Sequence, residues 1–366
     1  MESNWAQLKG LSGDLAWDYW DREHFLADLP GKWSLSLRAD QAGSVAGYAI
    51  ASQKGNWLWL HHLVVAASHR GTGLGGRLLA ELEARCDRFG AKGVRLKVGS
   101  DNAGALPFYA RAGYQSVGAP AEYLLYEKLR PGREKIVAVH QPNYMPWLGY
   151  FDKMLACDDF IFLDDALTSN NSFINRNRIK QHGGELWLTI PCRQHLSDPI
   201  NQVTYADAKW PKKHLKTIQQ YYGKAKYFKD YFPTLEAILT APPAKLAELN
   251  IKLIRQFADW LGIRCATHLS SDLRPEGTSD DRLVSLVQLL RGHVYLSGKG
   301  GANYQSEEKY RQAGIRLVYQ SFRPPTYPQL GGEFVLGLSV LDLLFNCGPD
   351  ARGILEASGR EAQEAA

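Results

Sequence analysis

The 366-residue sequence predicts two domains: an α+β domain with a mixed, mostly antiparallel sheet over residues 1–131, and an α/β domain with a mostly parallel sheet over residues 132–366. Three observations lead to this prediction. The chain is too long for one ordinary hydrophobic core. A Pro-Gly linker among charges, LRPGREK, lies near residue 132 and is followed directly by the apolar strand pattern IVAVH. The order of strand and helix patterns differs on the two sides of that linker.

The composition is that of a globular protein, with 45% hydrophobic and 22% charged residues. A net charge of +5 suits anionic small-molecule ligands but is too small to indicate nucleic-acid binding. Five scattered cysteines without a CxxC pair predict reduced thiols and a cytoplasmic location. The sequence shows no signal-peptide pattern and no run that could span a membrane. We expect no metal site, because the ten histidines are scattered.

In the first domain the pattern predicts a helix, an antiparallel meander, a helix, a strand, a helix and two strands. The strands are expected over residues 34–40, 44–53, 56–65, 93–99, 114–117 and 123–128, and the helices over residues 14–29, 74–89 and 103–112. This order is typical of an α+β layout and not of a doubly wound sheet.

A glycine-rich turn lies between the third strand and the second helix. In the segment SHRGTGLGGRLL, Arg70, Gly73 and Gly75 form the pattern R-x-x-G-x-G. Glycines let backbone N–H groups close on an anion at a helix N-terminus, where the helix dipole adds positive potential. Arg70 can add a charge-assisted contact. The same pattern also occurs in tight turns without a ligand, so by itself it is a weak signal for a phosphate site.

A second segment, DNAGALPFYARAGY over residues 101–114, follows this turn. Together the two segments resemble the motifs of the GNAT superfamily of acyl-CoA N-acyltransferases, R/Q-x-x-G-x-G/A and N-x-x-A-x-x-F-Y-x-x-x-G-F/Y. The resemblance implies acetyl-CoA or another acyl-CoA as donor, an amine as acceptor, and Tyr109 as the acid that protonates the departing thiolate. The cofactor-binding residues that it implies are Leu63, Val65, Arg70, Gly71, Thr72, Gly73, Leu74, Gly75, Gly76 and Asn102.

The catalytic base is less well marked. Many GNAT members carry a glutamate on the strand before the turn, where this chain has His61 and His62. Successive strand residues face opposite sides, so only one of the two is expected in the cleft. By the family's register we favour His62, because the unperturbed pKa of histidine suits a base near neutrality. An ordinary histidine on a strand surface would give the same pattern.

In the second domain, a strand (IVAVH), a helix from about Pro146 to Ala156 and a strand (DFIFLD) predict a parallel sheet covered on both faces. A helical covering layer is expected over residues 209–263. Ligands of open α/β sheets bind at the carboxyl ends of the strands. The candidate site residues near such ends and in the basic segment NNSFINRNRIK are His140, Gln141, Asn143, Tyr144, Asp165, Asn175, Arg176, Arg178, Lys180, Asp281, Lys299 and Tyr304. We expect six of them around one cleft: His140, Tyr144, Asp165, Arg176, Arg178 and Lys299.

Residues 135–348 also resemble a known family, the WbqC-like proteins. The matching segments are HQPNYMPWLGYFDK, FLDD, SFINRNRIK, WLTIP, YLSGKGGANY and LSVLDLLFNCG. The resemblance implies a role in surface-polysaccharide (O-antigen) synthesis, but it implies no particular reaction.

Three hypotheses about function stay open at this point. In the first, the N-terminal domain acylates an amine, such as an amino sugar on a nucleotide carrier, and the WbqC-like domain binds or further modifies the same substrate. In the second, the WbqC-like domain is the main catalyst of a glycosyl- or aminoacyl-type transfer, and the GNAT domain supplies an acylated precursor. In the third, the WbqC-like domain is a non-catalytic docking module. The sequence leaves the acceptor, the acyl chain length and the oligomeric state open.

Overall fold

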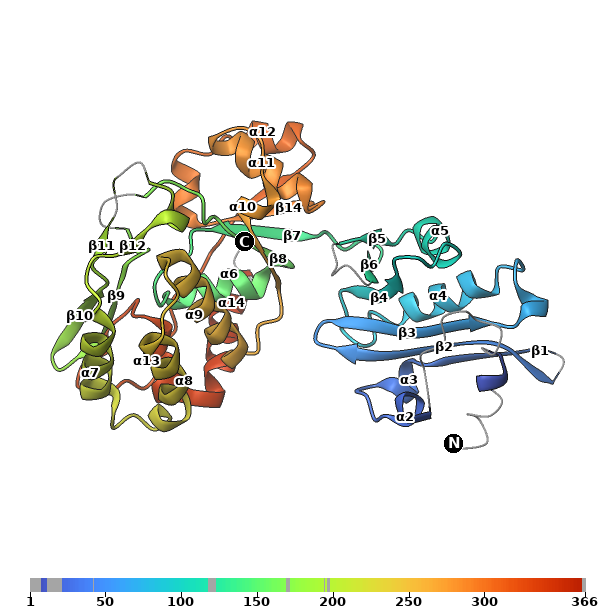
Figure 1. Cartoon of the computed structure of the whole chain (residues 1–366), viewed down its shortest axis with the longest axis horizontal. Coiled ribbons are helices and arrows are strands. Elements are labelled where there is room, and N and C mark those ends of the chain that lie inside the picture. Colours follow the sequence, from blue (N-terminus) through green and yellow to red (C-terminus); the bar gives the residue numbers. More distant parts are fainter. Residues whose placement is uncertain are drawn as a thin grey trace. The chain divides into compact units, whose positions relative to one another are not determined.

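The computed structural model describes residues 8–11, 22–41, 43–117, 123–168, 172–193, 195 and 198–363, with side chains up to residue 357. The chain divides into two compact units, Met1–Glu134 and Lys135–Ala366. The division falls inside the LRPGREK segment. Each unit has its own main sheet (Figure 1).

The first unit contains a six-stranded sheet with the strand order β1-β2-β3-β4-β6-β5. Its strands are β1 (Leu37–Gln41), β2 (Ser44–Lys54), β3 (Trp57–Val65), β4 (Gly93–Gly99), β5 (Gln115–Ser116) and β6 (Tyr123–Leu129). Strands β3 and β4 pair in parallel, and the other neighbours pair antiparallel. The predicted mixed, mostly antiparallel sheet is therefore confirmed.

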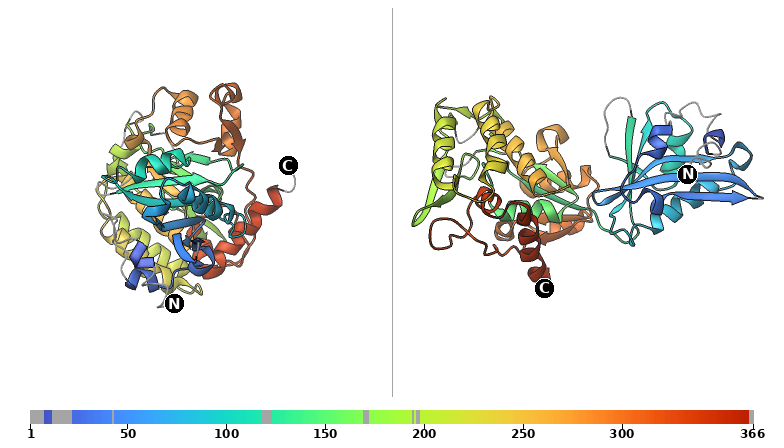
Figure 2. Two further views of the ribbon diagram at one scale, coloured as in Figure 1. Left: turned by 90° about the vertical axis from the view of Figure 1, so that its right-hand side faces the viewer. Right: turned by 90° about the horizontal axis from the view of Figure 1, so that it is seen from below.

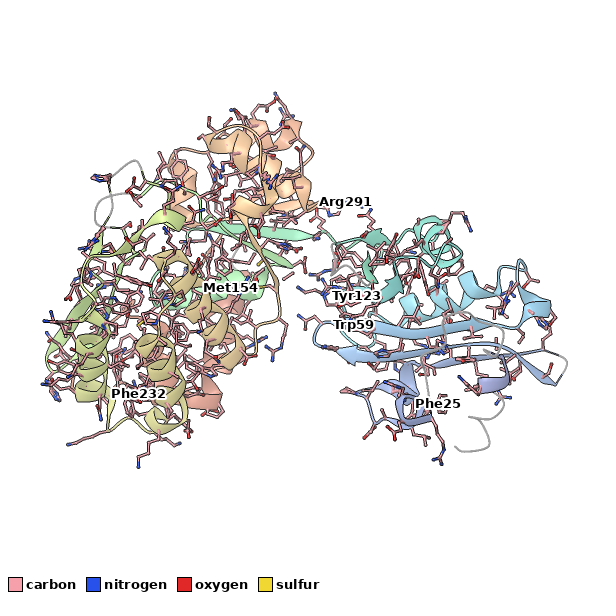
Figure 3. All side chains as sticks on the ribbon, viewed as in Figure 1. Phe25, Trp59, Tyr123, Met154, Phe232 and Arg291 are labelled. Carbon is pink, nitrogen blue, oxygen red and sulfur yellow. The ribbon has the colours of Figure 1, made fainter. Side chains whose placement is uncertain are left out.

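Helices cover both faces of this sheet. Helix α4 (Leu74–Ala84) follows the short η1 turn (Ala67–His69) and lies over one face, with Leu78 and Leu82 in the core. Helix α5 (Ala105–Arg111) packs against the same core. On the opposite face, Phe25 of α2 (Arg22–Leu26), which is labelled in Figure 3, packs with Tyr48 of β2.

Two predicted elements of this unit differ from the structure, and a third is described only in part. The helix predicted over residues 14–29 lies partly outside the described residues. The strand predicted over residues 34–40 starts only at Leu37, because the chain first forms the short helix α3 (Lys32–Leu35). The helix predicted to reach Phe89 ends at Ala84, because a series of turns through Gly90, whose φ is +60°, leads the chain into β4.

The second unit contains a five-stranded sheet in which every neighbouring pair is parallel. Its strands, in spatial order, are β13 (Ala266–Leu269), β8 (Asp159–Phe162), β7 (Ile136–His140), β14 (Val294–Ser297) and β15 (Arg316–Tyr319). The chain runs from β7 outward to one edge and then from β14 outward to the other edge. The predicted parallel sheet is confirmed, and its strand order reverses between β7 and β14.

Apolar side chains alternate between the two faces of this sheet. Val137 and Ile161 pack with α11 (Ser279–Leu289) and α12 (Glu307–Gln312) on one face. Ala138 and Phe160 pack with Met154 of α6 (Leu148–Ala156) on the other face. Figure 1 shows α11 and α12 on one side of the sheet and α6 on the other, and Figure 2 shows the unit from two further directions. Burial on both faces explains why these strands are almost continuously apolar.

A layer of helices and two small hairpin sheets complete the second unit. The segment expected to be helical over residues 209–263 consists of α7 (Trp210–Tyr222), α8 (Phe228–Thr240) and α9 (Leu246–Trp260). The other elements are α10 (Ser270–Leu273), α13 (Val340–Cys347), α14 (Ala351–Gln363), β9 (Arg176–Gln181) paired with β10 (Gly184–Thr189), β11 (Cys192–Arg193) paired with β12 (Thr204–Tyr205), η2 (Ile200–Gln202), η3 (Lys299–Asn303) and η4 (Gly348–Asp350). In the described part of the chain, no helix combines the length and the apolar character needed to cross a membrane.

Tyr144, one of the predicted site residues, belongs to the core of the second unit. Its side chain is fully buried, and its hydroxyl oxygen lies 2.9 Å from Nδ1 of His214. Nε2 of His214 lies 3.2 Å from the carbonyl oxygen of Thr189. Because a carbonyl can only accept, Nε2 carries the proton and Nδ1 accepts from the tyrosine. Burial lowers the pKa of His214 to about 4, so its ring is neutral at pH 7.

Replacing Tyr144 by phenylalanine would leave Nδ1 of His214 buried without a donor. We expect Tyr144→Phe to lower the free energy of unfolding by about 1–3 kcal/mol, measured by urea denaturation. Tyr304→Phe, a change in a side chain that is 73% exposed, is the matched control and should have little effect. Equal stability of Tyr144→Phe and the wild type would show that this hydrogen bond contributes nothing.

Candidate functional site

A cleft of about 830 Å³ opens in the first unit where β3 and β4 separate. The two strands pair only from Leu58 opposite Val94 to Leu60 opposite Leu96. Beyond this point, residues 61–65 of β3 and residues 97–99 of β4 line the cleft. The ladder between the strands ends there, so an extended ligand can lie between them and use their backbone groups.

Strand β3 carries a bulge where the opening starts. In its antiparallel pairing with β2, His62 is opposite Ile50 and Leu60 is opposite Ala51, so His61 is the additional residue. A bulge interrupts the alternation of side chains along a strand and redirects them. Both His61 and His62 therefore line the cleft, and the expectation that only one of them does so is wrong.

The two histidines have different surroundings. Nδ1 of His62 lies 3.1 Å from the hydroxyl oxygen of Tyr48, and Nε2 of His61 lies 2.7 Å from Oγ of Ser52. Burial, with the nearby charges of two lysines, lowers the pKa of His61 to about 4. His61 is thus neutral at pH 7 and is a weak proton acceptor.

The turn before α4 forms one end of the cleft. Gly71 and Gly73 have φ values of +79° and +81°, in the left-handed region that favours glycine. Helix α4 starts directly after Gly73, with no side-chain cap and no acidic residue in its first turn. The first N–H groups of any helix have no acceptor within the helix, and here no capping side chain supplies one. Residues 73–76 also line the cleft. This end of the cleft is suited to an anion.

The charged side chains that line the cleft are basic. Arg70, Lys97 and Arg111 contribute to the described lining, and no carboxylate does. Nε of Arg70 donates to the carbonyl oxygen of Val65 at 3.1 Å, which holds the guanidinium beside the turn. This electrostatic environment favours a ligand with several negative charges.

Helix α5 contributes the remaining wall. Tyr109 is half-buried, and its ring lies 5.1 Å from that of Phe108 and 5.8 Å from that of Tyr114. Oδ1 of Asn102 accepts the N–H of Ala105 at 3.0 Å and so holds the start of the helix. The ring of Phe108 approaches α4 closely: a Cβ atom on Gly75 would lie 3.2 Å from its Cζ.

Most residues that the GNAT resemblance assigned to the site meet in this cleft. Those that line it are His62, Leu63, Val65, Arg70, Gly71, Gly73, Leu74, Gly75, Gly76, Asn102 and Tyr109. Thr72 is not part of this lining, and its hydroxyl donates to the carbonyl oxygen of His69 at 2.7 Å. Sequence analysis missed Lys97 and Arg111. Lys97 alternates with the apolar residues of β4, a pattern that any solvent-facing strand residue shows.

The second unit has a smaller pocket, of about 270 Å³, where the strand order reverses between β7 and β14. We call it the switch-point pocket. Its lining consists of His140, Trp147, Gly149, Tyr150, Lys153, Gly298, Lys299, Gly300, Gln320 and Phe322. His140 ends β7 and Lys299 follows β14, so the pocket lies at the carboxyl ends of neighbouring parallel strands.

The switch-point pocket includes only two of the six residues expected around one cleft, His140 and Lys299. Tyr144 lies in the core. Asp165 forms an ion pair with Arg282 at 2.5 Å. The expectation of one common cleft is therefore wrong.

The two arginines of the basic segment lie on the β9–β10 hairpin. Arg178 forms an ion pair with Glu185 at 2.7 Å, and the guanidinium of Arg176 lies 4.6 Å from the ring centre of Trp187. Cross-strand pairing on a hairpin accounts for these contacts. Sequence reasoning could not foresee this, because the partners come from the second strand of the hairpin.

The other candidates of the second unit are placed as follows. The backbone carbonyl oxygen of Gln141 accepts a hydrogen bond from the hydroxyl of Tyr150, and Asn143 is buried. Asn175 donates to the carbonyl oxygen of Ile190, and Lys180 donates to that of Glu333. Asp281 forms an ion pair with Lys309, and Tyr304 is exposed. None of these six lines the switch-point pocket.

His140 is held in one tautomer. Its Nδ1 lies 3.1 Å from the carbonyl oxygen of Gln141, so Nδ1 carries the proton and Nε2 is an acceptor. Its ring centre lies 4.7 Å from that of Tyr150. Burial, followed by the charge of Lys153, lowers the pKa of His140 to about 3.

Each of the two units matches a known protein family. Residues 3–114 match the acetyltransferase (GNAT) family, so the first unit is a GNAT-type acetyltransferase domain. Residues 141–354 match the WbqC-like protein family. Because this second match covers more than half of the sequence, the chain belongs to the WbqC-like protein family.

Individual relatives cover different parts of the chain. The uncharacterized protein Rv1507c of Mycobacterium tuberculosis is 33% identical over 223 residues, 59% of this chain and 96% of that protein. Blasticidin-S acetyltransferase of Streptomyces morookaense is 36% identical over 89 residues, 24% of this chain, and the chain spans only 60% of its length. Among solved structures, Ard1 from Thermoplasma volcanium shares 20% identity over 35% of this chain and 93% of its own, with a TM-score of 0.33.

We expect His140 to stay neutral throughout the pH range from about 5 to 8, because its folded pKa lies well below the usual value of about 6.5. NMR spectra of the imidazole would then show no titration in this range. Lys153→Met removes the second cause of the shift and should raise the pKa of His140. A titration midpoint near 6.5 in the wild type would contradict this prediction.

Proposed function

We propose that the first unit transfers an acyl group, acetyl in the simplest case, from acyl-CoA to an amine, and that the cleft between β3 and β4 is its active site. One observation supports this most: the turn before α4, the opening between the strands and Tyr109 all line a single cleft. The diphosphate of the donor would lie on the amides of residues 70–76 beside Arg70. Its pantetheine arm would extend along Leu63 and Val65.

The residues of the cleft suit direct attack of an amine on a thioester. The nitrogen forms a bond to the carbonyl carbon, the carbon–sulfur bond breaks, the amine loses a proton to a base, and the thiolate gains a proton from an acid. We assign the base to His62, because the low pKa of His61 makes it a weak acceptor. We assign the acid to Tyr109, a half-buried phenol on the wall of the cleft.

For the acceptor we propose an amino sugar on a nucleotide carrier, used for surface polysaccharide, with the WbqC-like unit binding or further modifying the same molecule. The family resemblance of the second unit supports this assignment. The switch-point pocket favours ligand binding by the second unit over a role as a docking module alone. The five free cysteines suit a reaction in the cytoplasm.

The direct test of this function is release of free thiol from acetyl-CoA by the full chain. The acceptors compared would be nucleotide-linked amino sugars and free amino acids. We expect turnover with an amino sugar, and lower turnover when the nucleotide is removed. If no amine in either group accelerates thiol release, the proposed reaction is wrong.

Gly75 provides a test of donor binding. Valine at this position would place methyl groups against Phe108, where even a Cβ atom lies at 3.2 Å, and would narrow the cleft. We expect Gly75→Val to weaken CoA binding by about tenfold or more, measured by isothermal titration calorimetry. Gly184→Val is the control, since nothing lies within 4 Å of its added Cβ. Unchanged CoA affinity in Gly75→Val would place the donor elsewhere.

Tyr109 provides a test of the chemical step. We expect Tyr109→Phe to lower kcat by roughly 10²–10⁴-fold, the usual contribution of a general acid, and to leave CoA affinity unchanged. Tyr126→Phe, in β6 outside the cleft lining, should keep full activity. His62→Gln should lower kcat more than His61→Gln does. The reverse order would transfer the role of base to His61.

A further inference from the structure

The switch-point pocket contains a buried lysine that sequence analysis did not single out. Lys153 lies on α6 and is 2% exposed, yet it lines the pocket. Within the described residues, its Nζ has no hydrogen bond and no ion pair. A buried ammonium without an anionic partner costs several kcal/mol, so a fold keeps one only where it is otherwise compensated.

The surroundings of Lys153 supply that compensation only in part, because the charge of Asp152 favours the ammonium form but the two side chains form no ion pair. Its neighbour in sequence, Asp152, accepts a hydrogen bond from Nε2 of Gln320 at 2.6 Å instead. Burial lowers the pKa of Lys153 to about 8, so the ammonium form still predominates at pH 7. A positive charge therefore faces the pocket under ordinary conditions.

A second cation and a glycine lie close to it. Lys299 is also part of the lining, and no carboxylate is part of the described lining. Gly298 is next to Nζ of Lys153: a Cβ atom added there would lie 3.3 Å from this nitrogen. The glycine thus leaves Nζ accessible to the pocket.

The rest of the lining suits the carbon skeleton of a small ligand. Trp147 and Phe322 form an aromatic wall, with ring centres 5.5 Å apart. Nε2 of His140 can accept a hydrogen bond from a hydroxyl or amine. The pocket volume of about 270 Å³ is just below the usual range of about 300–1,000 Å³ for drug-sized ligands, which limits the bound part to about the size of one sugar.

We propose that the switch-point pocket binds a phosphorylated small molecule of about the size of one sugar, and that Lys153 is the counter-ion of its phosphate. Lysine acts as a point charge and is a common phosphate ligand, whereas a planar carboxylate is usually held by the paired N–H groups of arginine. The described lining has two lysines and no arginine. This inference concerns the second unit alone and does not depend on acyl transfer by the first.

The test is calorimetric titration of the full chain with glucose 6-phosphate, inorganic phosphate, gluconate and glucose. We expect the two phosphates to bind and glucose not to bind. Lys153→Met should weaken glucose 6-phosphate binding roughly tenfold to a hundredfold, the usual effect of losing a charged hydrogen bond. Lys216→Met, which removes an exposed lysine on α7 and the same net charge, should leave binding unchanged. Any phosphate that binds to the first unit would contribute equally to the heat measured for the wild type, Lys153→Met and Lys216→Met.

Two further measurements distinguish a binding role from a structural one. Lys153→Met should melt at a higher temperature than the wild type without ligand, because it removes a buried charge that is compensated only in part, and should lose the stabilisation by phosphate. Gly298→Ala keeps the lysine but places a methyl group beside Nζ, and it should also weaken binding. Wild-type phosphate affinity in Lys153→Met, or gluconate binding as tight as that of glucose 6-phosphate, would overturn the proposal.

Discussion

Both candidate sites depend on one constraint, the point at which two neighbouring parallel strands stop being joined. In the first unit this is the end of the ladder between β3 and β4, after Leu60 and Leu96. In the second unit it is the end of the ladder between β7 and β14, after Ala138 and Leu296. A continuous sheet satisfies its backbone groups internally and offers little to a ligand. Where two parallel strands part, backbone groups and loop residues become available together.

The electrostatics of the two sites are similar even though their folds differ. The described lining of each contains basic residues and no carboxylate. In the first unit the positive potential comes largely from groups near the surface, Arg70 and the start of α4. In the second unit it comes from a lysine inside the protein. A charge held inside the protein interacts more strongly with a ligand than one in water, and it costs more to maintain.

Sequence could predict the features that depend on neighbours along the chain. Gly71 and Gly73 adopt left-handed backbone conformations within one turn, and Asn102 accepts the N–H of Ala105 at the start of α5, the helix that carries Tyr109. Features that depend on distant segments were not accessible in this way. The bulge at His61 depends on its pairing with β2, and the access of Lys153 to its pocket depends in part on Gly298, far along the chain. The basic segment at Arg176 and Arg178 looked like an anion site because its hairpin partners were unknown.

The bulge in β3 also makes the first site tolerant of one change in chain length. Without His61, Leu60 and His62 would be consecutive and would still be opposite Ala51 and Ile50, so β3 could pair regularly with β2 and residues 62–65 would keep their faces. A single-codon deletion at this position would therefore remove one side chain and leave the rest of the cleft wall in place.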